Sequence, residues 1–198
     1  VKAGPGFAIA LDHLSAASRR IDCTVVGMTE IKRRRLEENV VDCHPRTKVG
    51  EYVPFYFCFR SVMLYLLHMG NHPDVSYRGG QRPILHLESD VKAVVQWAEA
   101  SEVGWAFSKG NAGARYMSFS KDLKKLSLLD WGAIAATDWE APSVRDPKQA
   151  EFLVERFLPW NLIERIGVID ENTAADVEVR LANARHKPEI VVTRNWYY

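Results

Sequence analysis

Six short runs of apolar or alternating residues restrict the fold of this chain more than any other feature of its sequence. They lie at residues 53–57, 83–87, 103–107, 151–154, 165–169 and 189–193. Runs of this length and composition are typical of β-strands. Because there are more such strands than βαβ units, a doubly wound parallel sheet is disfavoured. We therefore predict an α+β fold with two small packed sheets.

Two helices are predicted from the residues at their ends. Residues 61–69 place apolar side chains about one helical turn apart, and Gly70 follows as a typical helix terminator. Residues 171–184 are preceded by Asp170, whose side chain can cap the first turn. Pro188 then prevents the helix from continuing.

The longest irregular, polar stretch comprises residues 137–150 and contains Pro142 and Pro147. It leads directly into Glu151. Long loops in compact domains tend to carry functional residues. We expect this stretch to be a functional loop.

Length and composition favour one domain that spans residues 1–198. Hydrophobic residues make up 47% of the chain, but no stretch approaches the roughly 20 apolar residues of a membrane-spanning helix. The first residues lack the apolar region and cleavage site of a secretion signal. We therefore expect a protein of the cytoplasm with no membrane association.

Several common kinds of site have no support. Cys23, Cys43 and Cys58 are widely spaced and odd in number, which suits neither a disulfide framework nor a zinc site, so we expect reduced thiols. His68 and His72 have the spacing of a helical metal pair, but a glycine and a proline interrupt that helix, and we expect no metal. A phosphate-binding glycine loop, a dinucleotide fingerprint and a nucleophile elbow are all missing from the sequence.

The net charge is only +1, so any binding of nucleic acid would depend on local basic patches. One candidate is the segment 31–39, IKRRRLEEN, in which four basic residues precede two acids. Such a run is either the solvated face of a surface helix or loop, or a surface that contacts a phosphate-bearing ligand.

Residues 53–65, VPFYFCFRSVMLY, closely resemble the VPFYF-x-x-RS-x-MLY signature of the DarT family of DNA ADP-ribosyltransferases. Phe59 and Val62 stand where prolines are common, at positions that concern loop shape. Further blocks follow the order of that family: IKRRRLEEN at 31–39, WAFSKGNAGARYMSF at 105–119 with LLDW downstream, QAEFLVERFLPWNLIERIGV at 149–168, and a closing NWYY. Together these blocks cover most of residues 27–198.

The resemblance implies an ADP-ribosyltransferase fold of two small sheets around an NAD+ cleft, with NAD+ as co-substrate. By match to the motifs, Arg60 is the family's essential arginine and Glu151 its catalytic glutamate. Cleavage of the nicotinamide bond builds positive charge on the ribose, which an ionised carboxylate stabilises. A guanidinium can bind diphosphate oxygens and stabilise a base that is losing a proton. Without the resemblance, both residues would be interpreted as surface residues.

The same match assigns the NAD+ contacts to Phe57, Arg60, Ser61 and Tyr65, all within the signature. We expect Glu151 to be an exposed carboxylate of the cleft. Its removal should therefore cost little packing energy and leave the fold intact.

Residues 108–119, SKGNAGARYMSF, combine Lys109 and Arg115 with Asn111 and Tyr116. Cations can contact phosphates and an aromatic ring can stack on a base. The alternative is the start of a helix with its aromatic residues buried. With the family resemblance, we predict that these four residues and Arg33 bind DNA.

The match fails at the start of the chain. Family members usually begin with a strand whose histidine grips the NAD+ ribose, and no such strand precedes residues 8–22, AIALDHLSAASRRID. His13 lies in the wrong context to replace it. We expect this end to be truncated or divergent, which would weaken NAD+ binding or leave a protein that binds DNA without modifying it.

The resemblance implies a toxin that transfers ADP-ribose to a base of single-stranded DNA, with a DarG-type macrodomain antitoxin as its partner. Thymine is the expected acceptor, because its ring nitrogen becomes a nucleophile by losing a proton, and an unpaired strand avoids the cost of extruding the base. The alternatives are a catalytically degenerate nucleic-acid-binding relative, and a transferase that acts on guanine, RNA or protein.

Overall fold

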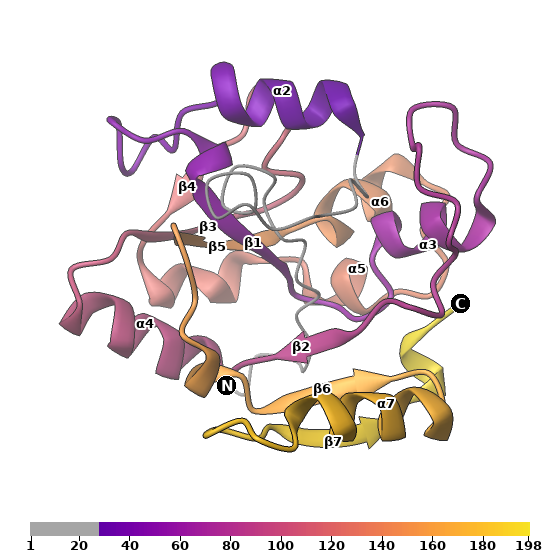
Figure 1. The fold of residues 1–198 in the computed structure, drawn as a ribbon. Helices are drawn as coiled ribbons and strands as arrows, with labels where there is room; N and C mark the ends of the chain where they lie inside the picture. The colour runs from indigo at the N-terminus through magenta and orange to yellow at the C-terminus, as the bar shows by residue number, and fades with distance from the viewer. Residues whose placement is uncertain (1–27) are drawn as a thin grey trace.

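A computed structural model describes residues 28–198 of the chain. The expectations for residues 8–22, for His13 and for Cys23 lie outside the described residues. Two β-sheets form the centre of the described part, and helices cover them (Figure 1). The predicted α+β architecture with two small sheets is confirmed.

The first sheet is antiparallel and has the strand order β1-β5-β3-β4. Its strands are β1 (Tyr52–Tyr56), β5 (Glu151–Glu155), β3 (Trp105–Ser108) and β4 (Phe119–Ser120). The edge strand β1 contains Pro54. Proline has no backbone N–H to donate, and an edge strand tolerates this because it pairs with a neighbour on one side only. In the register of β1 against β5, Tyr56 lies opposite Glu151.

The second sheet has the order β2-β6-β7, with β6 and β7 parallel. Its strands are β2 (His86–Glu88), β6 (Arg165–Val168) and β7 (Glu189–Val192). The parallel pair is joined by α7 (Glu171–Leu181), which packs on both strands. As predicted, the Asp170 side chain caps this helix by accepting the backbone N–H of Thr173. The helix ends three residues before the predicted Ala184.

The remaining helices surround the first sheet. They are α2 (Thr29–Glu37), α3 (Val62–Met69), α4 (Val91–Ala100), α5 (Trp131–Ala135) and α6 (Pro142–Lys148), together with the 3-10 turns η1 (Val49–Glu51), η2 (Leu123–Leu128), η3 (Trp160–Leu162) and η4 (Arg194–Trp196). The predicted boundaries of α3 are confirmed: Ser61 Oγ accepts the N–H of Leu64, and Gly70 ends the helix with a φ of 61°. No helix among residues 28–198 is long and apolar enough to cross a membrane.

The expectation of an irregular stretch at residues 137–150 is wrong, because this stretch contains α6. Both prolines of this stretch are compatible with a helix because of the turns in which they lie. Pro142 occupies the first turn of α6, where its missing N–H has no helical partner to lose. Pro147 lies in the last turn, so it removes only one hydrogen bond from a helix of seven residues.

Alternation along the strands of the first sheet divides its side chains between two cores. Phe152 and Val154 of β5 pack with α4 and α5 on one face, whereas Leu153 packs with Val41 and Val49 on the other. Figure 1 shows α2 on one side of this sheet and α4 and α5 on the opposite side. Since residues two apart share a face, Glu151 projects to the same face as Leu153.

The buried histidine of β2, His86, is enclosed by aromatic rings. Its ring makes edge contacts with Phe59, Trp196 and Tyr197, and neither ring nitrogen has a hydrogen-bond partner among the described residues. Burial lowers the pKa of His86 to about 4 from its usual 6.5. Two of the closing aromatic residues, Trp196 and Tyr197, therefore pack onto the domain.

His86 should make the stability of the fold sensitive to acid. The unfolded chain takes up the proton near pH 6.5 and the folded chain only near pH 4, so folding stability falls as the pH drops through this interval. We expect the parent to lose about 2 kcal/mol more unfolding free energy than His86→Leu between pH 7 and pH 5. Urea titrations at several pH values measure this, with His68→Leu as the control. Equal losses in the parent and in His86→Leu would contradict the assignment.

Candidate active site

The candidate catalytic residue, Glu151, begins β5 and points toward the side of the sheet that α2 covers. Its side chain is only 2% exposed, so the expectation of a surface-exposed carboxylate is wrong. The cause is the strand alternation described above, together with the loop between β3 and β4, which closes over the carboxylate. A carboxylate buried in this way requires charged and hydrogen-bonding partners.

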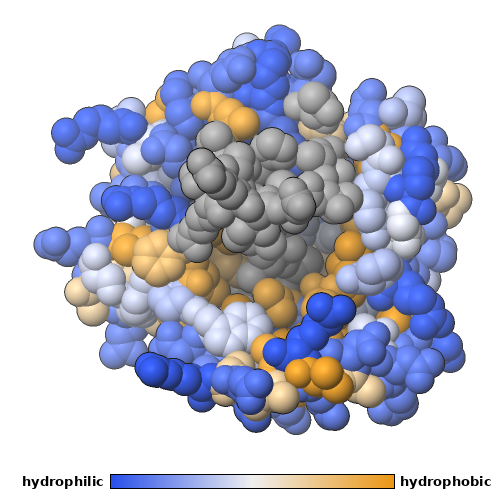
Figure 2. All heavy atoms as spheres, viewed as in Figure 1, coloured by the Kyte–Doolittle hydropathy of each residue, from blue (hydrophilic) through white to orange (hydrophobic). Residues whose placement is uncertain are grey.

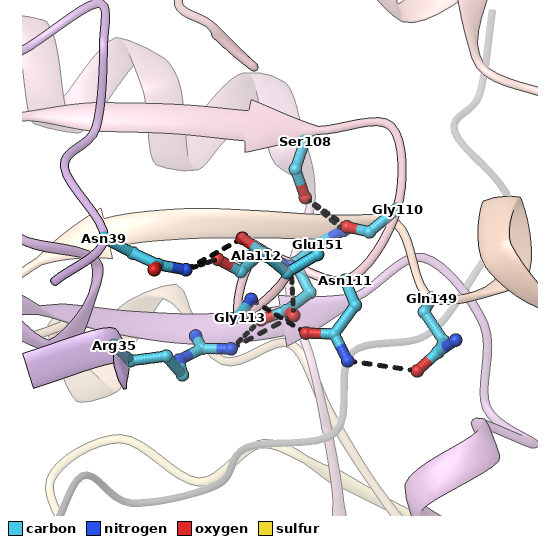
Figure 3. Close-up of polar contacts among 10 residues, drawn as sticks. Arg35, Asn39, Ser108, Gly110, Asn111, Ala112, Gly113, Gln149 and Glu151 are labelled. Carbon is cyan, nitrogen blue, oxygen red and sulfur yellow. Dashed lines mark hydrogen bonds and ion pairs between the residues drawn. The ribbon is translucent and has the colours of Figure 1, made fainter. Parts of the chain in front are cut away.

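Arg35 of α2 is the charged partner of Glu151 (Figure 3). Its Nη1 donates to both carboxylate oxygens, at 3.1 Å to Oε1 and 2.9 Å to Oε2. The backbone N–H of Ala112 donates to Oε1 at 2.9 Å. The Arg35 side chain is 14% exposed, which places the ion pair where water screens it little. These contacts fix the orientation of the carboxylate and compensate its charge.

The loop that supplies Ala112 is held against α2 by a second residue of the same segment. Asn39 Nδ2 donates to the carbonyl oxygens of Ala112 and Ala114, at 3.1 and 3.0 Å (Figure 3). A Cβ atom at Gly113 would lie 2.7 Å from Cγ2 of Ile31, so only glycine permits this approach of the loop to α2. The segment from α2 to Asn39 thus positions both the carboxylate and the loop that donates to it.

The loop is also tied to the residues that precede Glu151. Asn111 Nδ2 donates to Gln149 Oε1 at 3.1 Å, and the backbone N–H of Glu151 donates to Ser108 Oγ at 3.2 Å. Lys148 is buried and donates from Nζ to the carbonyl oxygens of Ile134 and Ala136, at 3.0 and 2.7 Å. These contacts anchor the end of the 137–150 stretch where it enters β5.

Tyr56 is the strand neighbour of Glu151. Burial raises the pKa of the Tyr56 phenol above its usual value, the charge of Glu151 raises it further, and Arg35 opposes the shift. The phenol therefore remains a neutral hydrogen-bond donor at physiological pH. It adds a protonated hydroxyl to the electrostatic surroundings of the carboxylate.

Arg60 lies in a different set of contacts from Glu151. Its guanidinium stacks 4.4 Å above the Tyr198 ring, and Tyr198 Oη donates to the Arg60 carbonyl oxygen at 2.9 Å. Within residues 28–198, Arg60 forms no ion pair with Glu151. The sequence predicts both residues as catalytic but does not indicate that Arg35 is the cation beside the carboxylate.

Two guanidinium nitrogens near the site are buried without a hydrogen-bond partner among the described residues. They are Nη2 of Arg35 and Nε of Arg60. A buried donor without an acceptor costs about 1–3 kcal/mol. Acceptor atoms of a ligand, such as the phosphate oxygens of a dinucleotide, would relieve this cost. The two arginines therefore have the chemistry that an anionic ligand requires.

The other predicted NAD+ contacts differ in what they offer a ligand. Phe57 is buried, with its ring against Trp131 and Phe152, so it contributes mainly to the core. Ser61 is buried and its hydroxyl caps α3. Tyr65 is partly exposed and packs against Trp139 and Tyr198.

The predicted DNA contacts separate into exposed and engaged side chains. Lys109, Arg115 and Tyr116 are exposed, and the Tyr116 side chain is 97% exposed. The alternative of a helix start with buried aromatics is therefore wrong at Tyr116. Asn111 is half-buried and hydrogen-bonded to Gln149. Arg33 is exposed but ion-paired with Glu30, Glu37 and Glu38 of its own segment.

The structure contains little support for metal or thiol chemistry in its described part. Residues 28–198 hold no group of three His, Cys, Asp or Glu side chains placed to bind a metal ion. Cys43 and Cys58 are free thiols. Burial raises the pKa of Cys58 to about 11, which keeps this thiol protonated and unreactive at physiological pH.

Comparisons with known proteins match the chain to a single family. The family model described as "ssDNA thymidine ADP-ribosyltransferase, DarT" matches residues 9–198. A DNA ADP-ribosyl transferase of Thermus aquaticus is 45% identical over 161 residues, which cover 80% of this chain and 68% of that protein. A DNA ADP-ribosyl transferase of Mycobacterium tuberculosis is 26% identical over an alignment that covers 98% of this chain and 84% of that protein.

Solved structures match the fold as well. The structure of Thermus sp. 2.9 DarT in complex with ADP-ribosylated ssDNA superposes with a TM-score of 0.83 at 31% identity, covering 100% of this chain and 98% of that one. The same protein in complex with NAD+ gives a TM-score of 0.76, with coverage of 100% and 99%. The fold and the site therefore define an NAD+-dependent ADP-ribosyltransferase. Within this class, the chain belongs to the DarT family.

Removal of the Glu151 carboxylate should destabilise the fold, contrary to the expectation for an exposed residue. Glu151→Ala leaves the Arg35 charge buried without its partner, and we expect a loss of about 3 kcal/mol in unfolding free energy. The double variant Arg35→Leu/Glu151→Ala removes both charges and should recover part of that loss. Urea unfolding of the parent, both single variants and the double variant measures the coupling. If the unfolding free energy of Glu151→Ala lies within about 0.5 kcal/mol of the parent's, the ion pair between Arg35 and Glu151 contributes nothing to stability.

Proposed function

We propose that this chain transfers ADP-ribose from NAD+ to thymine in single-stranded DNA, with Glu151 as the catalytic carboxylate. The observation that carries the proposal is the carboxylate of Glu151, buried and fixed by Arg35 and the Ala112 N–H in a chain of the DarT family. A rigid anionic group in a site of low dielectric stabilises positive charge that develops beside it. The reaction proposed for the family requires such a group.

The proposed reaction exchanges one glycosidic bond for another. The bond between the ribose C1′ and the nicotinamide nitrogen breaks, and its electron pair leaves with neutral nicotinamide. Glu151 accepts a hydrogen bond from a ribose hydroxyl and stabilises the positive charge at C1′. The thymine ring nitrogen bonds to C1′ and releases its proton to the Glu151 carboxylate or to water. Arg60 stabilises the base as it loses this proton.

The NAD+ contacts are proposed for Arg60, Ser61, Tyr65 and Phe57. Arg60 has a buried Nε without a partner among the described residues, which supports a role in binding phosphate oxygens. Tyr65 offers a partly exposed ring beside Tyr198. Ser61 caps α3 and Phe57 packs in the core, so both hold the backbone of this segment in place. Their proposed contribution is to maintain the shape of the NAD+ site.

The DNA surface is proposed to consist of Lys109, Asn111, Arg115, Tyr116 and Arg33. Three of these side chains are exposed on the loop that also donates the Ala112 N–H to the carboxylate. Asn111 supports the loop from within through its bond to Gln149. Arg33 would have to exchange ion pairs with its three acidic neighbours before it could meet a phosphate.

The wider setting is proposed from the family. We infer one domain over residues 1–198, a location in the cytoplasm, and a toxin role restrained by a DarG-type macrodomain antitoxin. A solved structure named Thermosipho africanus DarTG in complex with ADP-ribose shares the fold, with a TM-score of 0.72 at 15% identity. Guanine, RNA or a protein side chain as the acceptor, and a degenerate relative that only binds nucleic acid, are the alternatives to be tested.

The transferase proposal predicts a mass gain on DNA. Single-stranded oligonucleotides of mixed sequence are incubated with NAD+ and the protein, and intact mass analysis should show the addition of one ADP-ribose together with nicotinamide release. Fragmentation should locate the adduct on thymine. We expect Glu151→Gln, which keeps the size of the side chain, to reduce transfer at least about hundredfold because the charge is lost. Glu155→Gln, at the other end of β5, serves as the control.

The outcomes separate the alternatives. DNA binding without nicotinamide release would support the degenerate relative. An adduct on guanine, on RNA alone, or equally on duplex DNA would contradict the proposed acceptor. Transfer by Glu151→Gln within about tenfold of the parent, which corresponds to roughly 1.4 kcal/mol of barrier, would contradict the role of Glu151.

The charge environments of the basic residues predict different salt responses. Each phosphate contact releases condensed counterions, so affinity for single strands should fall as salt rises, with a slope of roughly −0.7 for each contact. Arg115→Ala should flatten this slope by about one contact. Arg33→Ala should change it less, because the Arg33 charge is already compensated by acids. Fluorescence anisotropy with a labelled oligonucleotide at several salt concentrations measures both, and a salt-independent affinity in the parent would contradict phosphate binding by this surface.

A further inference from the structure

A concave site lies next to the contacts that support the Glu151 carboxylate. It is a pocket of about 500 Å³ between the end of α2 and the loop that leads into β4. Its lining residues are Glu38, Asn39, Val40, Ala114, Arg115, Tyr116, Met117 and Phe119. The roles assigned above to Glu151, Arg35 and Arg60 do not involve this pocket. Its size falls in the range of pockets that bind small organic groups.

The pocket and the carboxylate share the same supporting contacts. Asn39 lines the pocket and donates to the carbonyl oxygens of Ala112 and Ala114. The N–H of Ala112 in turn donates to Glu151. The pocket therefore lies on the same loop that helps to hold the carboxylate, within reach of a DNA strand that crosses this loop.

The chemistry of the walls fits a nucleobase. Tyr116 at the pocket is 97% exposed, and Val40, which also lines the pocket, is 39% exposed. Met117 and Phe119 add apolar surface. An open aromatic ring beside apolar side chains provides a stacking platform for any base.

The charges around the pocket indicate that the phosphate of a bound nucleotide would lie at the rim of the pocket and not inside it. Glu38 is ion-paired with Arg33 at 2.8 Å, so this wall offers no free positive charge to capture a phosphate inside the pocket. Arg115 is exposed at the pocket and has no ion-pair partner among the described residues. Stacking of a base against Tyr116 would bring the adjoining phosphate toward Arg115.

We propose that this pocket binds the base of a nucleotide that neighbours the modified one on the same DNA strand, with the base stacked on Tyr116 and its phosphate facing Arg115. The proposal rests on the proposed function, because it assigns a second contact to the same acceptor strand. The pocket holds the strand in register while Glu151 and Arg60 act on the acceptor base. Because stacking tolerates every base, this contact adds affinity with little sequence preference.

A scan with abasic sites tests the proposal. A set of oligonucleotides carries a single thymine, and one neighbouring position at a time lacks its base. For the parent, one such position should lower kcat/KM about tenfold, the size expected for the loss of one stacked base. Tyr116→Ala should lower kcat/KM about tenfold on the intact oligonucleotide and show no further loss at that same position. Because Tyr116 is exposed, its removal should leave the fold intact, and a thermal unfolding scan of the variant checks this.

Matched variants define the control. Tyr116→Phe keeps the stacking ring and should retain the abasic penalty that the parent shows at that position. Phe157→Ala removes a different exposed aromatic ring, which lies outside the pocket against Trp97, and should leave the abasic pattern unchanged. The KM for NAD+ should be the same in all four proteins, since the pocket is assigned to DNA.

Three results would overturn the proposal. The first is an equal abasic penalty in the parent and in Tyr116→Ala at every position. The second is a rise in the KM for NAD+ alone in Tyr116→Ala, which would assign the pocket to the dinucleotide. The third is an equal affinity of Tyr116→Ala and the parent for the intact strand, measured by fluorescence anisotropy alongside the abasic set. This binding measurement tests the pocket even if no oligonucleotide gains ADP-ribose, a result that would contradict the proposed function itself.

Discussion

Burial of the Glu151 carboxylate imposes a constraint that the surrounding chain has to meet. A charge removed from water needs a counter-charge and hydrogen-bond donors, or the fold that buries it becomes unstable. Arg35 and the N–H of Ala112 supply them, at 2.9 Å each. To bring these donors into place, α2 has to cover the first sheet, and the loop after β3 has to turn back over the start of β5 (Figure 1).

The helix that meets this constraint also faces solvent. Arg35 points inward to the carboxylate, while Arg33 lies outward among three acids of the same segment. The basic segment 31–39 therefore presents less positive charge at the surface than its number of basic residues indicates. Figure 2 shows a hydrophilic surface over α2. In the proposed function, the positive charge for DNA comes instead from Lys109 and Arg115, which form no ion pair within residues 28–198. They lie on the loop that also contains the Ala112 donor to Glu151.

Local patterns in the sequence predict most of the fold. The apolar runs, the cap at Asp170 and the glycine at position 70 each act within a few residues of chain, so the strands and helix ends follow from them. A signal of the same local kind marks α4: Asp90 caps it, and its buried residues recur at helical spacing from Val91 to Ala98. Residues 137–150 contain a helix despite their prolines, because the two prolines fit the first and last turns of α6.

The sequence by itself determined the family, through motifs that hold Arg60 and Glu151, and it determined the secondary structure near them. Only the tertiary structure decided that Glu151 is buried and that Arg35 is its cation. The two residues are 116 positions apart, and no local pattern records which basic residue of the run meets a given strand. Which basic residue pairs with Glu151 depends on how α2 packs against the first sheet and on the Asn39 contacts that hold the loop there. An ion pair forms only where packing has brought its two partners within a few ångströms.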